Sequence, residues 1–162
     1  MRNTSSLLAS AAAIFLTVLL ASSVQAAEKK PLLDKGKLSI GVGISNNSVG
    51  GSDDELGYQF FADYDLTQLN LMEGVNSSVE FGVMDYGFSR DSTGIWGTYV
   101  IDGHIGAGFG WLARLGLDIG DDSGLMLGGG ASFSVNKKID LRLEYVVRDD
   151  VDSLQFNFLY RL

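Results

Sequence analysis

The chain has 162 residues, of which 21 are Gly, one is Pro and none is Cys, and it carries a net charge of −8 with a single His. Without Cys it has no disulfide framework, thiolate zinc site, haem attachment motif or cysteine nucleophile. The acidic balance disfavours a nucleic-acid partner, because contacts to phosphates need a basic face. The length suits one domain with a sizeable core, and we expect no metal and no other cofactor.

Residues 1–26 have the pattern of an export signal. Arg2 precedes an apolar run over residues 7–21, and Val24 and Ala26 occupy positions −3 and −1 of a cleavage site before Ala27. A positive start, a short apolar stretch and small residues at the cut define a secretory signal peptide. The apolar run is shorter than the roughly 20 residues of a spanning helix, which disfavours a membrane anchor. We predict a cleaved signal peptide and export from a bacterium.

The rest of the chain shows apolar residues that alternate with glycine and polar residues, after a short lead over residues 27–36. Alternation with a period of two predicts strands, and no segment keeps a helical period. We predict eight strands, at residues 37–45, 55–64, 78–88, 94–102, 104–119, 125–135, 139–147 and 153–162.

Two of these strands are less regular than the others. The alternation changes phase near Asp85, which indicates a bulge or the beginning of a loop. Residues 94–102 are apolar on both faces, and there we place Ile95, Tyr99 and Ile101 outward. We expect the turn between this strand and the next at Asp102-Gly103.

The two faces of the strands decide between a soluble and a membrane barrel. Opposite the rows of Leu, Ile, Val and Phe stand glycines, serines and charges of both signs. Glycine weakens a solvated strand face and gains nothing there, whereas small residues are needed inside a narrow barrel. The strands also have about the 9–11 residues that a tilted strand needs to cross a bilayer. We predict an all-β, eight-stranded antiparallel up-and-down transmembrane barrel over residues 37–162, with apolar side chains facing lipid.

The last 39 residues resemble a known family. Residues 124–162 hold a Gly-rich strand, a polar turn, the strand Leu141-Arg142-Leu143-Glu144-Tyr145, an acidic loop and a final strand with alternating aromatics. This order is similar to the last two hairpins of the small outer-membrane β-barrels, a group that includes the outer-membrane protein A transmembrane domain and the opacity-protein-like barrels. The resemblance implies a final strand read by the outer-membrane insertion machinery. Its signal would be Phe156, Phe158, Tyr160 and Leu162, although Leu162 stands where the family usually has Phe.

Charged residues on the inward face form the first candidate site. Buried charges must be paired, and both signs are available there. An eight-stranded barrel has room for side chains rather than for a wide channel. We therefore expect a salt-bridged and mostly closed lumen, built from Glu80, Arg114, Asp118, Asp140, Arg142, Glu144 and Arg161.

Acidic loops form the second candidate, at the end of the barrel that we assign to the cell exterior. Carboxylates attract hard divalent cations, which bridge lipopolysaccharide phosphates. No loop has EF-hand spacing, so a solvated acidic rim is the simpler interpretation. The residues are Asp53, Asp54, Glu55, Asp121, Asp122, Asp149, Asp150 and Asp152.

Two further sequence features could indicate an enzyme, but neither has the context that the chemistry requires. Gly108, Gly110 and Ala113 fit a dinucleotide-binding pattern, but they stand within a strand rather than at the start of a helix. His104 has no nucleophile and acid placed beside it by the sequence, so we interpret it as a solvated turn residue. We expect no enzymatic activity.

The function expected from the sequence is a structural or surface-interaction role in the outer membrane. The partners would be membrane lipid, lipopolysaccharide and the insertion machinery, and the protein would be a monomer. Two alternatives stay open: a narrow gated pore for small solutes or ions, and a soluble periplasmic barrel that binds an apolar ligand. The second alternative requires the Leu and Phe rows to face inward.

Overall fold

A computed structural model describes residues 34–50, 54–66, 72–89, 92–120 and 123–162 of the chain. The chain divides into two units, Met1–Asp34 and Lys35–Leu162. The predicted signal peptide and residues 27–33 of the predicted lead lie outside the described residues. Within the described ranges, no helix has the length and apolar character needed to cross a membrane.

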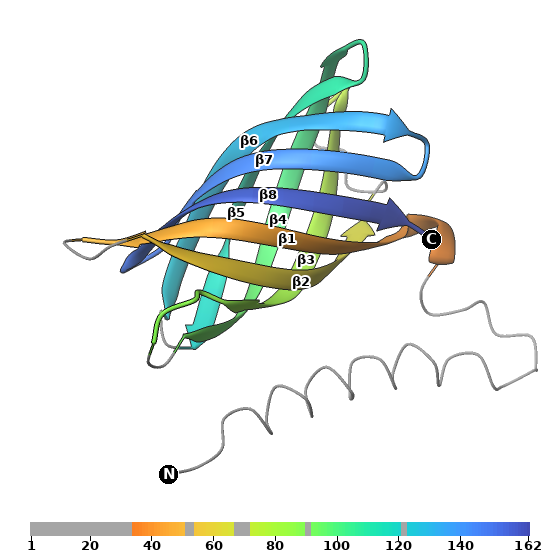
Figure 1. Cartoon of the computed structure of the whole chain (residues 1–162). Coiled ribbons are helices and arrows are strands. Elements are labelled where there is room, and N and C mark those ends of the chain that lie inside the picture. The colour runs from red at the N-terminus through yellow and green to blue at the C-terminus, as the bar shows by residue number, and fades with distance from the viewer. Residues whose placement is uncertain (1–33, 51–53, 67–71, 90–91, 121–122) are drawn as a thin grey trace, which may run out of the picture. The chain divides into compact units, whose positions relative to one another are not determined.

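The second unit is a closed barrel of eight antiparallel strands, which confirms the predicted fold (Figure 1). Each strand pairs with its neighbours in sequence, and β8 pairs with β1, so no strand edge is left open. A short 3-10 helix (η1, Lys35–Lys37) precedes the first strand. The strands are β1 (Leu38–Val49), β2 (Glu55–Asp65), β3 (Val75–Asp85), β4 (Thr93–Gly106), β5 (Phe109–Gly120), β6 (Gly124–Asn136), β7 (Ile139–Val147) and β8 (Val151–Arg161).

The barrel has two ends that differ in their connections. One end, here called the terminal end, holds the beginning of β1, the end of β8 and the β2–β3, β4–β5 and β6–β7 connections. The other end, here called the distal end, holds the β1–β2, β3–β4, β5–β6 and β7–β8 connections. Two of the terminal-end connections are turns of only two residues.

The predicted turn at Asp102-Gly103 is wrong. Gly103 pairs with Trp111 inside the sheet, and β4 continues to Gly106. The chain reverses at Ala107 and Gly108, whose φ angles are 52° and 83°. Glycine adopts positive φ without steric cost, so the glycines here permit the tight reversal. The sequence prediction placed Gly106 and Gly108 within the strand after the turn, whereas Gly106 ends β4 and Gly108 lies in the turn.

Other strand limits differ by a few residues. β3 ends at Asp85, so the phase change there marks the start of a connection rather than a bulge. β1 extends to Val49 and β8 begins at Val151, and these two residues pair at the distal end. β7 has the predicted limits.

Side chains alternate between the inside and the outside of the barrel, with the apolar rows outward. On β4, Ile95 is 52% exposed whereas its neighbour Trp96 is 1% exposed. Tyr99 and Ile101 are half-buried on the same outward face as Ile95, as predicted. This orientation removes the interpretation as a soluble barrel, which needed the apolar rows to face inward.

Glycines make room for large side chains inside the barrel. A β-carbon on Gly82 would stand within 2.6 Å of the Trp96 indole, and one on Gly41 would collide with the Phe61 ring. Because interiors are close-packed, these two aromatic rings fill the space that the missing side chains leave. The high glycine count is therefore in part a packing feature of the narrow lumen.

Candidate functional site

Ion pairs cross the middle of the lumen. Arg114 of β5 lies 3.1 Å from Glu80 of β3 and 2.5 Å from Glu144 of β7, measured from Nη2 to an Oε2 atom in each case. Arg142 of β7 pairs with the other oxygen of Glu80. These four side chains, here called the central cluster, connect three strands, and Arg114, Glu80 and Glu144 are almost fully buried.

Amide side chains extend the central cluster toward β8 and β2. Asn157 donates a hydrogen bond to Glu144 over 2.9 Å. Gln59 donates to the side-chain oxygens of Asn157 and Gln155, over 2.7 and 2.9 Å. Hydrogen bonds to a carboxylate compensate part of the cost of burying its charge. The amides thus link the ion pairs to the strands on the other side of the barrel.

A second group of polar side chains lies nearer the distal end. Arg148 donates from Nε to Asp118 over 2.9 Å and from Nη1 to Ser153 over 2.8 Å. Tyr86 donates to the same Asp118 oxygen over 2.5 Å. Ser153 donates to Asn47, which in turn donates to the Tyr86 carbonyl. We call Arg148, Asp118, Tyr86, Ser153 and Asn47 the distal cluster.

Aromatic and apolar side chains fill the space beside the two clusters. The Trp96 ring packs on Phe61 with 5.5 Å between centroids, and the Arg114 guanidinium lies 5.6 Å from the Trp96 centroid. The Arg148 guanidinium lies 5.5 Å from the Tyr86 centroid. Such cation–π contacts are strongest where the cation is desolvated. The buried apolar residues of this layer are Phe61, Met84, Tyr86, Trp96, Met126, Val146, Val151 and Leu159.

The structure brings together most of the charges that the sequence assigned to the lumen. Glu80, Arg114, Glu144 and Arg142 form the central cluster, and Asp118 belongs to the distal cluster. Asp140 is half-buried and accepts a hydrogen bond from Ser134 over 2.5 Å. Arg161 is exposed at the end of β8, so the structure places it outside both clusters. The last buried residue of the inward series of β8 is Leu159.

Several residues of the clusters were not predicted. Arg148 lies one residue beyond the predicted strand 139–147 and was not assigned to the lumen, but it is 5% exposed and pairs with Asp118. The signal was present, since Arg148 continues the inward series of Glu144 and Val146 one step beyond the strand. Gln155 and Asn157 of β8 show the same alternation.

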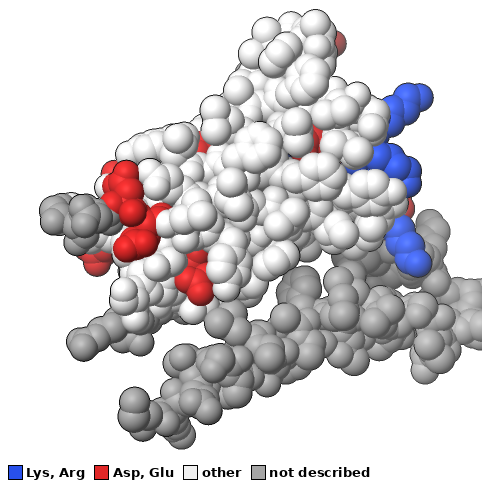
Figure 2. Space-filling view, in the orientation of Figure 1, with Lys and Arg blue, Asp and Glu red and all other residues white. Residues whose placement is uncertain are grey.

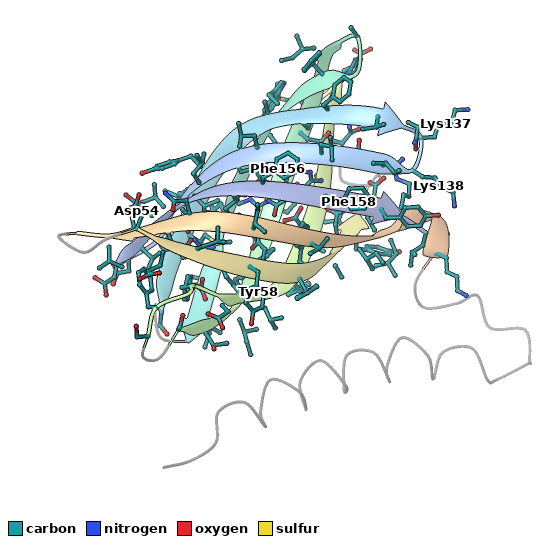
Figure 3. The ribbon with its side chains drawn as sticks, viewed as in Figure 1. Asp54, Tyr58, Lys137, Lys138, Phe156 and Phe158 are labelled. Carbon is teal, nitrogen blue, oxygen red and sulfur yellow. The ribbon has the colours of Figure 1, made fainter. Side chains whose placement is uncertain are left out.

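The described residues of the predicted acidic loops lie at the distal end, and the described lysines lie at the terminal end. Figure 2 shows the two signs at opposite ends of the face in view, and Figure 3 places Asp54 at one end and Lys137 and Lys138 at the other. Asp54, Glu55, Asp149 and Asp150 are exposed, and Asp152 is half-buried and accepts a hydrogen bond from Tyr145. Asp53, Asp121 and Asp122 lie outside the described residues. Among the described residues, no group of three or more His, Asp or Glu could hold a metal ion.

The residues of the proposed C-terminal assembly signal alternate on the outer face of β8. Phe156, Phe158 and Leu162 are exposed, and Figure 3 shows the two phenylalanines on β8. Tyr160 is half-buried, and its ring lies 5.3 Å from the Lys138 ammonium. His104 continues the inward series of β4, opposite Gly110, and is exposed near the terminal end of the barrel.

An apolar exterior and a polar, ion-paired interior define the class of the transmembrane β-barrels. Solved structures of this class are similar to the chain in fold. A de novo designed transmembrane β-barrel matches with a TM-score of 0.56 and 15% identity, over 84% of this chain and 100% of that one. The outer-membrane protein Ail of Yersinia pestis, solved in a phospholipid bilayer nanodisc, matches with a TM-score of 0.53 and 16% identity, over 78% and 99%. The de novo designed barrel TMB2.3 matches with a TM-score of 0.51 and 16% identity, over 80% of this chain and 98% of that one.

The comparisons by sequence give no relatives. No protein-family model matches the chain, and no curated protein matches it. The likeness to the solved structures therefore establishes the fold, which is that of the small eight-stranded outer-membrane barrels.

Proposed function

We propose that the chain is an integral protein of the bacterial outer membrane with a structural or surface-contact role and a lumen closed to solutes. The exterior supports membrane insertion, because exposed Leu, Ile, Val and Phe side chains surround the barrel. Exposure of so large an apolar surface to water would be unfavourable. Ail, which has the same fold, was solved in a bilayer. Residues 1–26 serve as a cleaved export signal in this proposal.

One observation supports the closed lumen above all others. Arg114 spans from β5 to carboxylates on β3 and β7 with no more than 1% exposure of the three side chains. A conducting path needs water along its length, whereas this section of the lumen is occupied by side chains that bind each other. Opening it would separate buried opposite charges, which is costly.

Planar-bilayer recordings test the closed lumen. We expect the refolded wild-type protein to show no stable conductance steps. Replacing Arg114, Glu80 and Glu144 together by Ala removes the central ion pairs and should introduce small steps. The matched control is Leu115→Ala on the outward face of β5, next to Arg114, which should stay silent. Large, voltage-independent steps from the wild-type protein would instead favour the pore alternative.

The distal end faces the cell exterior in this proposal. Both chain-terminal strand ends and two tight turns lie at the terminal end, and bacterial barrels keep their short turns on the periplasmic side. The exposed acidic residues at the distal end would then meet divalent cations among lipopolysaccharide phosphates. The alternating aromatics of β8 would direct assembly by the insertion machinery, and the barrel would act as a monomer.

Fractionation and gel mobility test the membrane assignment. We expect the protein in the outer-membrane fraction, cut before Ala27, with a band that shifts between unboiled and boiled samples. Release with the periplasmic contents, with no shifted band, contradicts the assignment. Lipid-hydrolysis assays on wild-type protein and His104→Ala should both give background rates.

A further inference from the structure

At the terminal end β4 extends beyond β3, and β6 extends beyond β5 and ends level with β7, where Asn136 pairs with Ile139. Val75, the first residue of β3, pairs with Gly103, and β4 continues three residues further to Gly106. Phe109, the first residue of β5, pairs with Phe133, and β6 likewise continues to Asn136. In Figure 1 the β4–β5 hairpin rises well clear of its neighbours, and in Figure 2 this projection is mostly uncharged. With 14 and 13 residues, β4 and β6 are also the longest strands of the barrel.

The exposed side chains of the projection are large and apolar, and two of them, Ile105 and Val135, stand at register shifts of the sheet. Ile105 is 72% exposed, Phe109 53% and Val135 51%. On β1 and β3 the corresponding outward positions near the terminal end are Leu38 and Ser77, both of which are buried. We call Ile105, Phe109, Phe133 and Val135 the projecting edge.

The projecting edge continues the apolar surface of the barrel without a polar break. Along β5 the outward residues from Phe109 to Ile119 are all apolar, which corresponds to about 24 Å of height for a strand tilted by about 45°. Along β1 the exposed apolar stretch runs only from Ile40 to Ile44, or about 10 Å. Membrane barrels typically carry a band about 25 Å tall. The apolar surface along β5 reaches that height, whereas the one along β1 does not.

Cations stand next to the projecting edge. Lys137 and Lys138 form the β6–β7 turn just beyond Val135 and are exposed. A lysine at the edge of an apolar surface can extend its ammonium to the lipid headgroups while its alkyl chain contacts the apolar surface. Such cations favour anionic lipids. The chemistry of the edge, apolar and then basic, matches an acyl layer followed by headgroups.

We propose that the projecting edge is inserted into the acyl chains of the leaflet at the terminal end, with Lys137 and Lys138 at its headgroups. Because the apolar surface is taller on this side, the barrel axis tilts to keep the edge in lipid. The inference rests on the proposed function, since it assumes a membrane barrel. It adds which side of the barrel contacts phospholipid most deeply.

Single-cysteine labelling tests the inference, and the absence of native Cys makes every label unique. Ile105→Cys reports the projecting edge, and Glu73→Cys, an exposed site in the β2–β3 connection, is the matched control at the same end. Leu115→Cys in the middle of β5 reports insertion itself. Each variant carries an environment-sensitive fluorophore and is refolded into phosphatidylethanolamine–phosphatidylglycerol vesicles, and its gel shift verifies the fold.

We expect lipid-borne nitroxide to quench the labels at Ile105 and Leu115, with blue-shifted emission, and aqueous iodide to quench the label at Glu73. The ratio of lipid to aqueous quenching should be several-fold higher at Ile105 than at Glu73. Equal aqueous quenching at these two sites, with Leu115 still in lipid, overturns the inference. So does Ile105 protected from both quenchers with cross-linking between copies, which would mean a protein contact. Aqueous quenching at Leu115 in a folded variant would instead refute the membrane barrel.

Discussion

The central and distal clusters use the same residue types in different ways. In the central cluster two arginines and two glutamates bind each other across three strands, and Arg114 serves two carboxylates at once. In the distal cluster one ion pair, Arg148–Asp118, is surrounded by neutral partners such as Tyr86 and Ser153. Removing Arg114 from the first cluster leaves two buried carboxylates with one cation, Arg142, between them. Removing one charge from the second cluster leaves a single charge with neutral hydrogen-bond partners. The stability lost when one partner of a buried ion pair is removed therefore depends on the neighbouring charges as well as on burial.

The largest effect is expected from Arg114→Met. The change leaves Glu80 and Glu144 buried, with Arg142 as the remaining cation of the central cluster. Breaking a buried pair from one side typically costs about 3–5 kcal/mol, and we expect that loss in the free energy of unfolding. Urea titration of the protein in lipid vesicles measures it.

A compensated variant separates charge from packing at this position. Combining Arg114→Met with Glu80→Gln and Glu144→Gln removes the isolated charges and should recover most of the stability lost. If Arg114→Met alone changes the free energy by less than about 1 kcal/mol, the central cluster is less important to the fold than its burial indicates.

The distal cluster should be less sensitive. Asp118→Asn keeps the shape of the side chain and an oxygen that accepts from Tyr86, but it removes the charge facing Arg148. A hydrogen bond to a charged group is worth about 1.5–3 kcal/mol, so we expect a loss of about 2 kcal/mol in the same titration. A loss as large as that of Arg114→Met would abolish the distinction between the clusters.

The sequence predicts the barrel well because alternation is a local property. In β5 to β8 the alternation of apolar and polar residues in the sequence identifies which side chains face lipid and which face the lumen. A shift of a strand end by a few residues does not change this assignment. The β4–β5 turn was missed because Asp102-Gly103 has turn composition, while the reversal depends on φ at Ala107 and Gly108. Which charges meet depends on the stagger of distant strands, so Glu80 and Glu144 could be assigned to the lumen but not to one arginine.

A glycine between the clusters tests the packing there. Gly82→Ala places a methyl group against the Trp96 indole and the Phe61 β-carbon, both inside the lumen. Overpacking of this kind costs about 1–3 kcal/mol. The matched control is Gly50→Ala at the distal end of β1, where a β-carbon meets no atom within 4 Å. The control should stay within about 0.5 kcal/mol of wild type, as surface changes usually do. Equal effects would mean that backbone freedom, and not contact with Trp96, accounts for the loss.

The smallest effect is expected outside both clusters, at the β6–β7 turn. Lys138 places its ammonium 5.3 Å from the Tyr160 ring centroid, and neighbouring Lys137 stands in the same turn. An exposed cation–π contact is worth about 0.5–1 kcal/mol, so Lys138→Ala should lower the free energy of unfolding by that amount.

Lys137→Ala removes the same charge from the same turn and is the control for electrostatic interaction with lipid headgroups. If both substitutions have the same effect in anionic vesicles and neither has one in zwitterionic vesicles, the lysines act on the headgroups alone. A loss specific to Lys138 in both lipids shows that the ring contact stabilises the end of β8, where solvation makes a cation far less important than at Arg114.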